Sequence, residues 1–122
     1  MPLSQLDNHA ALVVIDLQKG IVALPTVHPA ADVVAKSASI ARAFRAKNHP
    51  VVLVNISTSI GIEFTARYAS ELGYDVVMVT DAMTDLNAAA HENSVKMIFP
   101  RIGETVTTDE LLKVLGQVQL SA

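Results

Sequence analysis

The residues best placed for chemistry lie where an apolar run passes directly into a helix. Residues 51–56 form that run, and the following helix is predicted to begin near Ser59. The first turn of a helix offers free N–H groups and a partial positive charge, which stabilise a thiolate or an oxyanion. Gly61 stands in this turn without a side chain that can attack, and the chain contains no cysteine. The sequence therefore predicts a place for hydrolytic chemistry that lacks its nucleophile.

The three residues before this glycine, Thr58, Ser59 and Ile60, are the candidate binding residues. A hydroxyl nucleophile needs a positioned base, and no histidine is near the turn in sequence. We therefore interpret Thr58 and Ser59 as N-caps of the following helix. An alternative is that Gly61 lets a small anion approach the helix N-terminus closely.

Two acidic residues, Asp16 and Asp81, each end an apolar run that reads as a buried strand. In open α/β folds such strand ends line the ligand crevice, so Asp16 is a candidate general acid or base. Its alternative is a solvated strand end. If the two carboxylates faced each other they would raise one pKa or hold a divalent cation, but strand-end acids are common, and we predict no metal site and no cofactor.

The remaining polar candidates have structural interpretations. The four histidines show no metal-ligand spacing and are assigned to surface and loops. Thr84, Asp85 and Asn87 precede a helix and are interpreted as its caps. The histidines are His9, His28, His49 and His91.

The elements that position these residues follow from hydrophobic periodicity. The chain alternates strands with helices and ends in a capping box of Thr107 and Glu110. A proline, Pro100, is expected to close the helix before it, and Gly73 to stop the helix whose inward residues include Leu72. Predicted strands are 10–16, 51–56, 75–81 and a short edge strand at 104–107, and predicted helices are 32–47, 59–72, 87–99 and one opening at 107.

Alternation of strands and helices predicts parallel pairing with right-handed crossovers. Uniformly apolar strands need helices on both faces, which favours the strand order 2-1-3-4 over 1-2-3-4. The fold class is thus α/β, a three-layer α-β-α arrangement of Rossmann-like or flavodoxin-like type. We expect residues 1–122 to form one domain.

Composition limits the partners. With 122 residues and a formal charge of -3, the chain has no basic stripe for nucleic acid, and its apolar runs are too short to span a membrane. The absence of cysteine is consistent with a cytoplasmic location. An apolar fraction of 51% is high for so small a domain and predicts a homo-oligomer.

Three segments in order, 13–18, 58–65 and 73–82, resemble the isochorismatase-like hydrolases, a family of cysteine-dependent amidases and related enzymes. The similarity continues through 90–95 to 108–110. The resemblance implies that Asp16 holds the position of the catalytic acid and Gly61 that of the cysteine. It leaves no counterpart for the catalytic lysine, because the family inserts a further helix, strand and loops near Asn55–Ser57. It also implies a cis peptide at Ile56–Ser57.

Three hypotheses follow. The first is a shortened isochorismatase-like domain that is inactive in cysteine-dependent hydrolysis of small amides or esters and persists as an oligomeric fold or binding module for a small molecule. The second is a hydrolase in which Asp16 activates water without a covalent intermediate. The third is an engineered or recombined minimal scaffold.

Overall fold

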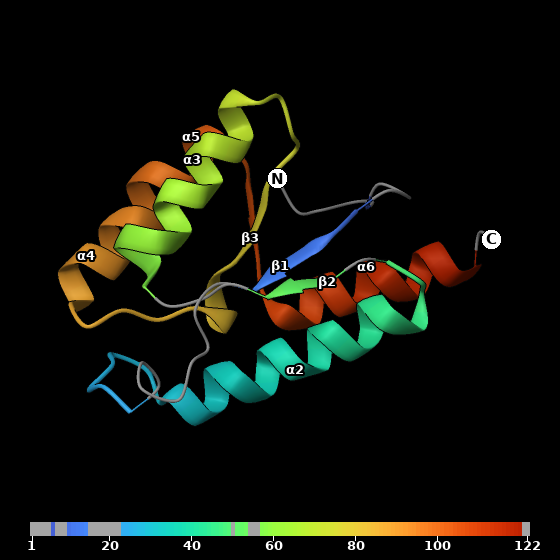
Figure 1. The fold of residues 1–122 in the computed structure, drawn as a ribbon, viewed down its shortest axis with the longest axis horizontal. Helices are drawn as coiled ribbons and strands as arrows, with labels where there is room; N and C mark the ends of the chain where they lie inside the picture. The colour runs from blue at the N-terminus through green and yellow to red at the C-terminus, as the bar shows by residue number, and fades with distance from the viewer. Residues whose placement is uncertain (1–5, 7–9, 15–22, 50, 54–56, 121–122) are drawn as a thin grey trace.

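The computed structural model describes residue 6 and residues 10–14, 23–49, 51–53 and 57–120. Two parallel strand pairs and the helices that pack on them make up this part of the chain (Figure 1). Asp16 and the Ile56–Ser57 peptide, both singled out from the sequence, lie outside the described residues. The strands are β1 (Leu12–Val14), β2 (Val51–Leu53), β3 (Val77–Val79) and β4 (Glu104–Val106). The helices are α2 (Ala30–Ala46), α3 (Glu63–Glu71), α4 (Ala88–Asn93), α5 (Phe99–Ile102) and α6 (Thr108–Leu120), with helical turns η1 (Thr58–Ile62), η2 (Thr80–Ala82) and η3 (Ser94–Ile98).

Both strand pairs are parallel, as the alternating pattern predicts. In the first pair Leu12 is opposite Val51, and in the second Val77 is opposite Glu104. The pairs β1–β2 and β3–β4 are the outer neighbours in the predicted order 2-1-3-4. The described residues place the two pairs in separate sheets, so the central β1–β3 neighbourhood stays a prediction.

The second strand pair carries a hydrophobic core on each face. Val77 and Val79 point toward α2 and α6, where Ile40, Phe44 and Leu115 are buried. Met78, the residue between them, points the other way. Its neighbours there are Ala66 of α3, Met83 and Phe99 of α5. In Figure 1, β3 accordingly runs between α3 and α5 on one side and α2 and α6 on the other. This part of the chain has the predicted three layers.

The helix α2 shows why the first long helix forms where it does. Buried residues recur along it at helical spacing and make one continuous face against the core, while Asp32 and Arg45 complement the helix dipole at its two ends. The buried residues are Val33, Ser37, Ile40, Ala41 and Phe44.

Helix boundaries test the predicted caps. Thr107 and Glu110 form the capping box reciprocally: the Thr107 N–H donates to Glu110 Oε2 at 2.8 Å and the Glu110 N–H to Thr107 Oγ1 at 3.3 Å. Gly73 has a φ of 86° just past α3, as a C′ glycine requires. The inward placement of Leu72 is wrong, because this residue at the end of α3 is 58% exposed.

The predicted stop at Pro100 is also wrong. The turn η3 shifts the helix into π geometry, and Pro100 then lies in the first turn of α5. Proline is tolerated in a first turn because the N–H it lacks has no partner within the helix there. The helix therefore continues to Ile102.

Gly103 provides a test of the β3–β4 junction. A Cβ at this position would lie 2.2 Å from the Val76 carbonyl oxygen, which accepts the Glu104 N–H at 2.9 Å. We expect Gly103→Ala to destabilise the fold by about 2 kcal/mol, because backbone must shift to admit the methyl group. A Cβ at Gly116, in α6, would meet no atom within 4 Å. Gly116→Ala is therefore the matched control and should stabilise by about 0.5–1 kcal/mol.

Urea unfolding of both variants measures these changes. Equal stability of Gly103→Ala and the wild type would contradict the close approach of Gly103 to Val76.

Candidate functional site

The turn η1 holds the residues that the sequence singles out. Thr58, Ser59, Ile60 and Gly61 are consecutive in this π-helical turn, which runs directly into α3. Thr58 is fully buried and Ile60 is 72% exposed, so the neighbouring candidates face different surroundings. The four candidates therefore share one turn but not one environment.

The hydrogen-bond donors at the start of η1 are bound by an acceptor from another segment of the chain, not by the side chain of Thr58 or Ser59. Ser57 is the N-cap residue and makes no side-chain cap bond. Asp85 Oδ2 instead accepts the Ser59 N–H at 2.7 Å, the Ser59 hydroxyl at 2.6 Å and the Ser57 hydroxyl at 2.7 Å. The interpretation of Thr58 and Ser59 as caps is therefore wrong. The Asp85 carboxylate thus occupies the position at the start of the turn where the helix dipole favours negative charge.

Asp85 is only 3% exposed, yet it is held in its charged form. Burial by itself would raise its pKa, but the hydrogen bonds from Ser59, Ser57 and the Asn87 N–H favour the carboxylate and lower the pKa to about 2. Of the residues interpreted as caps of α4, only Asn87 acts chiefly as one, accepting the Ala90 N–H at 3.0 Å.

Thr58 is bonded to both Thr84 and His91. Its hydroxyl donates to the Thr84 carbonyl oxygen at 2.9 Å, and its N–H donates to the same oxygen at 3.0 Å. His91 Nδ1 lies 2.9 Å from Thr58 Oγ1. Because the single hydroxyl proton is used on Thr84, His91 Nδ1 is the donor and its neutral ring keeps Nε2 as an acceptor. In this arrangement His91 does not activate Thr58 as a nucleophile.

The assignment of every histidine to surface or loops is wrong for His91, which lies in α4 and is 8% exposed. His28 is exposed in the loop before α2, as expected, and His9 lies outside the described residues. Burial, and secondly the neighbouring His28, lower the pKa of His91, while Asp85 and Glu92 act in the opposite direction. His91 is therefore neutral at neutral pH.

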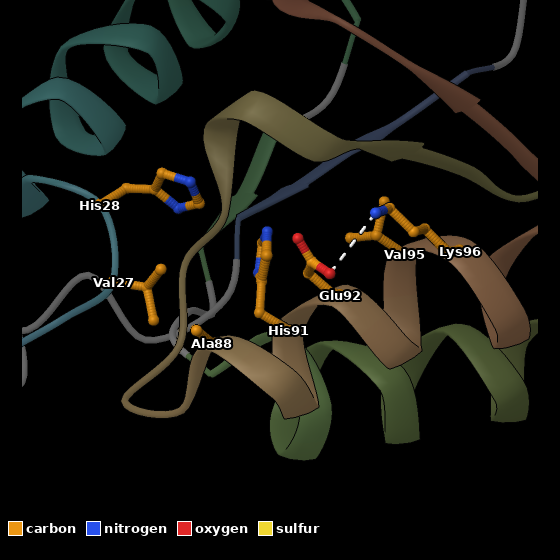
Figure 2. Close-up of a pocket in the computed structure, with 7 residues that line it drawn as sticks. All are labelled: Val27, His28, Ala88, His91, Glu92, Val95 and Lys96. Carbon is orange, nitrogen blue, oxygen red and sulfur yellow. Dashed lines mark hydrogen bonds and ion pairs between the residues drawn. The ribbon is translucent and has the colours of Figure 1, made fainter.

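A pocket of about 210 Å³ opens beside this polar cluster. Figure 2 shows His28 reaching it from the loop and His91 from α4, with their rings turned toward each other. The ring centroids are 5.0 Å apart. The His28 N–H donates to Thr84 Oγ1 at 3.1 Å, which fixes the loop over Thr84. The lining residues are Val27, His28, Ala88, His91, Glu92, Val95 and Lys96.

The pocket does not include Thr58, Ser59, Ile60 or Gly61 among its lining residues. It is connected to the turn through His91, whose Nδ1 contacts Thr58. Among the described residues, no group of three or more histidine and acidic side chains is arranged to hold a metal ion.

Asp81, the other strand-end acid, is used in packing. Its Oδ1 accepts the N–H and the hydroxyl of Thr108 at 2.7 and 2.8 Å, and its Oδ2 lies 3.5 Å from Lys36 Nζ. Asp81 thus caps α6 and joins it to α2.

Sequence reasoning missed His91, Thr84 and the bonds that Asp85 makes to η1. One signal was available: the polar residues Thr84, Asp85 and Asn87 follow strand β3, just as residues 57–59 follow β2. The carboxyl ends of parallel strands lie at one edge of a sheet, so these two segments had reason to meet.

The fold and the site define an α/β protein whose polar cluster is built from segments that follow parallel strands. The profile of the isochorismatase domain matches residues 10–59 and 51–110. The chain belongs to the isochorismatase family.

Relatives and solved structures agree with this assignment. An uncharacterised isochorismatase family protein of Bacillus subtilis, YwoC, is 48% identical over 63 residues, which make up 52% of this chain and 33% of YwoC. The chain thus spans about a third of the length of that curated relative. An isochorismatase family protein from Burkholderia thailandensis has a TM-score of 0.87 and 28% identity, with 92% of this chain and 98% of that chain covered.

A more distant structure, the YcaC gene product of Escherichia coli, has a TM-score of 0.76 at 17% identity, covering 100% of this chain and 87% of that one. At this identity the likeness concerns the fold alone. YcaC is described as an octameric hydrolase of unknown specificity. None of the helices in the described part of this chain has the length and apolar character needed to cross a membrane.

Proposed function

We propose that this chain is an isochorismatase-family domain that does not carry out cysteine-dependent hydrolysis of small amides or esters. The observation that carries the proposal is Gly61 in the turn η1, in a chain without cysteine. The Asp85 carboxylate supports it, because its bond to the Ser59 N–H places negative charge where a thiolate would need stabilisation.

The proposal includes a domain shortened in its middle. Two stretches of the chain match the family profile, and both include residues 51–59. An unbroken family domain would be expected to match once and continuously. Residues 51–59 occur in both matched stretches, which supports a deletion junction in this segment. The strand there would then take the positions of two strands of the complete family domain.

We also propose that the chain binds a small molecule and assembles with copies of itself. The pocket of about 210 Å³ is smaller than typical sites for drug-sized ligands, so a ligand of few atoms is expected beside His91. Self-assembly is supported by the apolar fraction of 51% and by the octameric state of YcaC.

Hydrolysis of small amide and ester substrates tests the loss of chemistry. We expect the wild type and the Asp16→Asn variant to show the same rate as buffer alone, because no nucleophile is in place. A wild-type rate that is lost in Asp16→Asn would overturn the proposal and favour activation of water by Asp16.

Gly61→Cys introduces the only thiol of the chain and reports on the turn. We expect its alkylation by iodoacetamide to follow a thiol pKa near or above the ordinary value of about 8.5, because the Asp85 carboxylate opposes a thiolate. The double variant Gly61→Cys with Asp85→Asn should titrate at least about one unit lower. A thiol pKa well below about 7 in the single variant would contradict this account of the turn.

A further inference from the structure

The outward side of η1 and α3 carries a row of large apolar side chains at four-residue spacing. Ile60, Phe64, Tyr68 and Leu72 are 72%, 73%, 62% and 58% exposed. We call these four residues the α3 stripe. Residues four apart lie one above the other on a helix, so the α3 stripe is one continuous ridge.

This exposure is unusual because α3 already buries its other side. Ala66 is 6% exposed and packs with Met78 and Phe99, and Ile62 is packed against the same cluster. A surface helix ordinarily presents polar residues opposite its buried stripe. A helix that is apolar on two sides is expected to be covered on both.

The flanks of the α3 stripe differ in size and charge. On one side lie the small residues Gly61, Thr65 and Ala69, which leave a groove along the ridge. On the other side Glu63 and Arg67 form an ion pair at 3.0 Å. Ridges of residues four apart pack into such grooves on another helix in the commonest class of helix packing.

We propose that the α3 stripe is the surface through which two copies of this chain associate, with their α3 helices antiparallel about a two-fold axis. The arrangement is self-complementary: Ile60 then meets the partner's Leu72, and Phe64 meets the partner's Tyr68. Each copy supplies both the ridge and the groove. The internal Glu63–Arg67 pair limits repulsion between like flanks.

The exposed area is sufficient for such an interface. Aromatic side chains bury roughly 150–250 Å² each, so Phe64 and Tyr68, which are 73% and 62% exposed, offer about 270 Å². Ile60 and Leu72 raise this to about 500 Å² per copy, and two copies reach about 1,000 Å², the least area expected of a specific interface.

A lipid surface fits the α3 stripe less well. Membrane-surface helices carry lysine and arginine beside their apolar face, whereas here Glu63 and Glu71 accompany a single Arg67. The acidic residues would be repelled by anionic lipid. The charges therefore favour a second copy.

This inference rests on the proposed self-assembly of the chain, and light scattering after size-exclusion chromatography separates the two. We expect the wild type to be a dimer or larger at micromolar concentration. Phe64→Glu and Tyr68→Glu should each weaken association at least about 100-fold, since each buries a charge at the centre of the interface.

Val34→Glu is the matched control, because Val34 is an exposed apolar residue on α2, away from α3 in Figure 1. It should leave the mass unchanged. Far-UV circular dichroism of each variant monitors folding, and both stripe variants should remain folded because their side chains are exposed within one copy.

A wild type that is monomeric would overturn both the self-assembly and the interface. A wild-type oligomer that survives Phe64→Glu and Tyr68→Glu in folded variants would overturn the interface alone. Binding of the wild type to anionic vesicles, lost in Phe64→Glu while the mass stays that of a monomer, would assign the α3 stripe to lipid instead.

Discussion

Replacing Asp85 by alanine is expected to destabilise the fold by about 3–4 kcal/mol. The change leaves the Ser57 hydroxyl, the Ser59 hydroxyl and the Ser59 N–H without their shared acceptor, and it empties a buried site. Unsatisfied donors of this kind cost about 1–3 kcal/mol each when buried, and these are partly buried. Equilibrium unfolding in urea measures the loss.

Two further variants make this result specific. Asp85→Asn keeps an oxygen acceptor for the serines but sets an amide N–H₂ against the Asn87 N–H, so we expect a smaller loss of about 1–2 kcal/mol. Asp75 is exposed, and Asp75→Ala should stay within about 0.5 kcal/mol of the wild type. If Asp85→Ala were as stable as Asp75→Ala, the role assigned to Asp85 would be wrong.

Acid is expected to destabilise the protein in two stages. The pKa of His91 is lowered in the folded state, so the unfolded chain takes up this proton first and stability falls as the pH drops below about 6.5. The pKa of Asp85 is lowered from 3.8 to about 2, so its contribution is present above pH 3.8 and is lost as the pH falls toward 2. The Asp85 stage corresponds to about 2 kcal/mol.

Thermal and urea unfolding between neutral pH and strongly acidic pH measure both stages. Asp85→Asn should remove the lower stage and leave the upper one, whereas His91→Asn should do the reverse. A wild-type profile that is flat from neutral pH down to about pH 4 would refute the buried, neutral state of His91.

Local signals in the sequence were enough to predict much of the fold. The capping box of Thr107 and Glu110, the C′ glycine Gly73 and the long helix α2 all depend on residues within a few positions of each other. Parallel pairing followed from the alternation of elements. These features depend on the spacing of residues along the chain, which can be read directly from the sequence.

The site depends on contacts that spacing does not reveal. Asp85 meets Ser59 across 26 residues, and His91 meets Thr58 across 33. A single histidine in the short helix α4 has no periodic pattern that indicates burial, so its environment is set by packing alone. The continuation past Pro100 likewise depended on the π geometry of η3.

The cluster of Ala66, Met78, Met83 and Phe99 has a consequence for the order in which the chain folds. All four residues lie between positions 66 and 99, so the loops that bring them together are short and cost little entropy to close. The core on the other face of β3 is expected to form later, because it needs Ile40 and Phe44 from the first half of the chain. The second half is therefore the region where collapse is expected to start, and α2 the element that docks on it later.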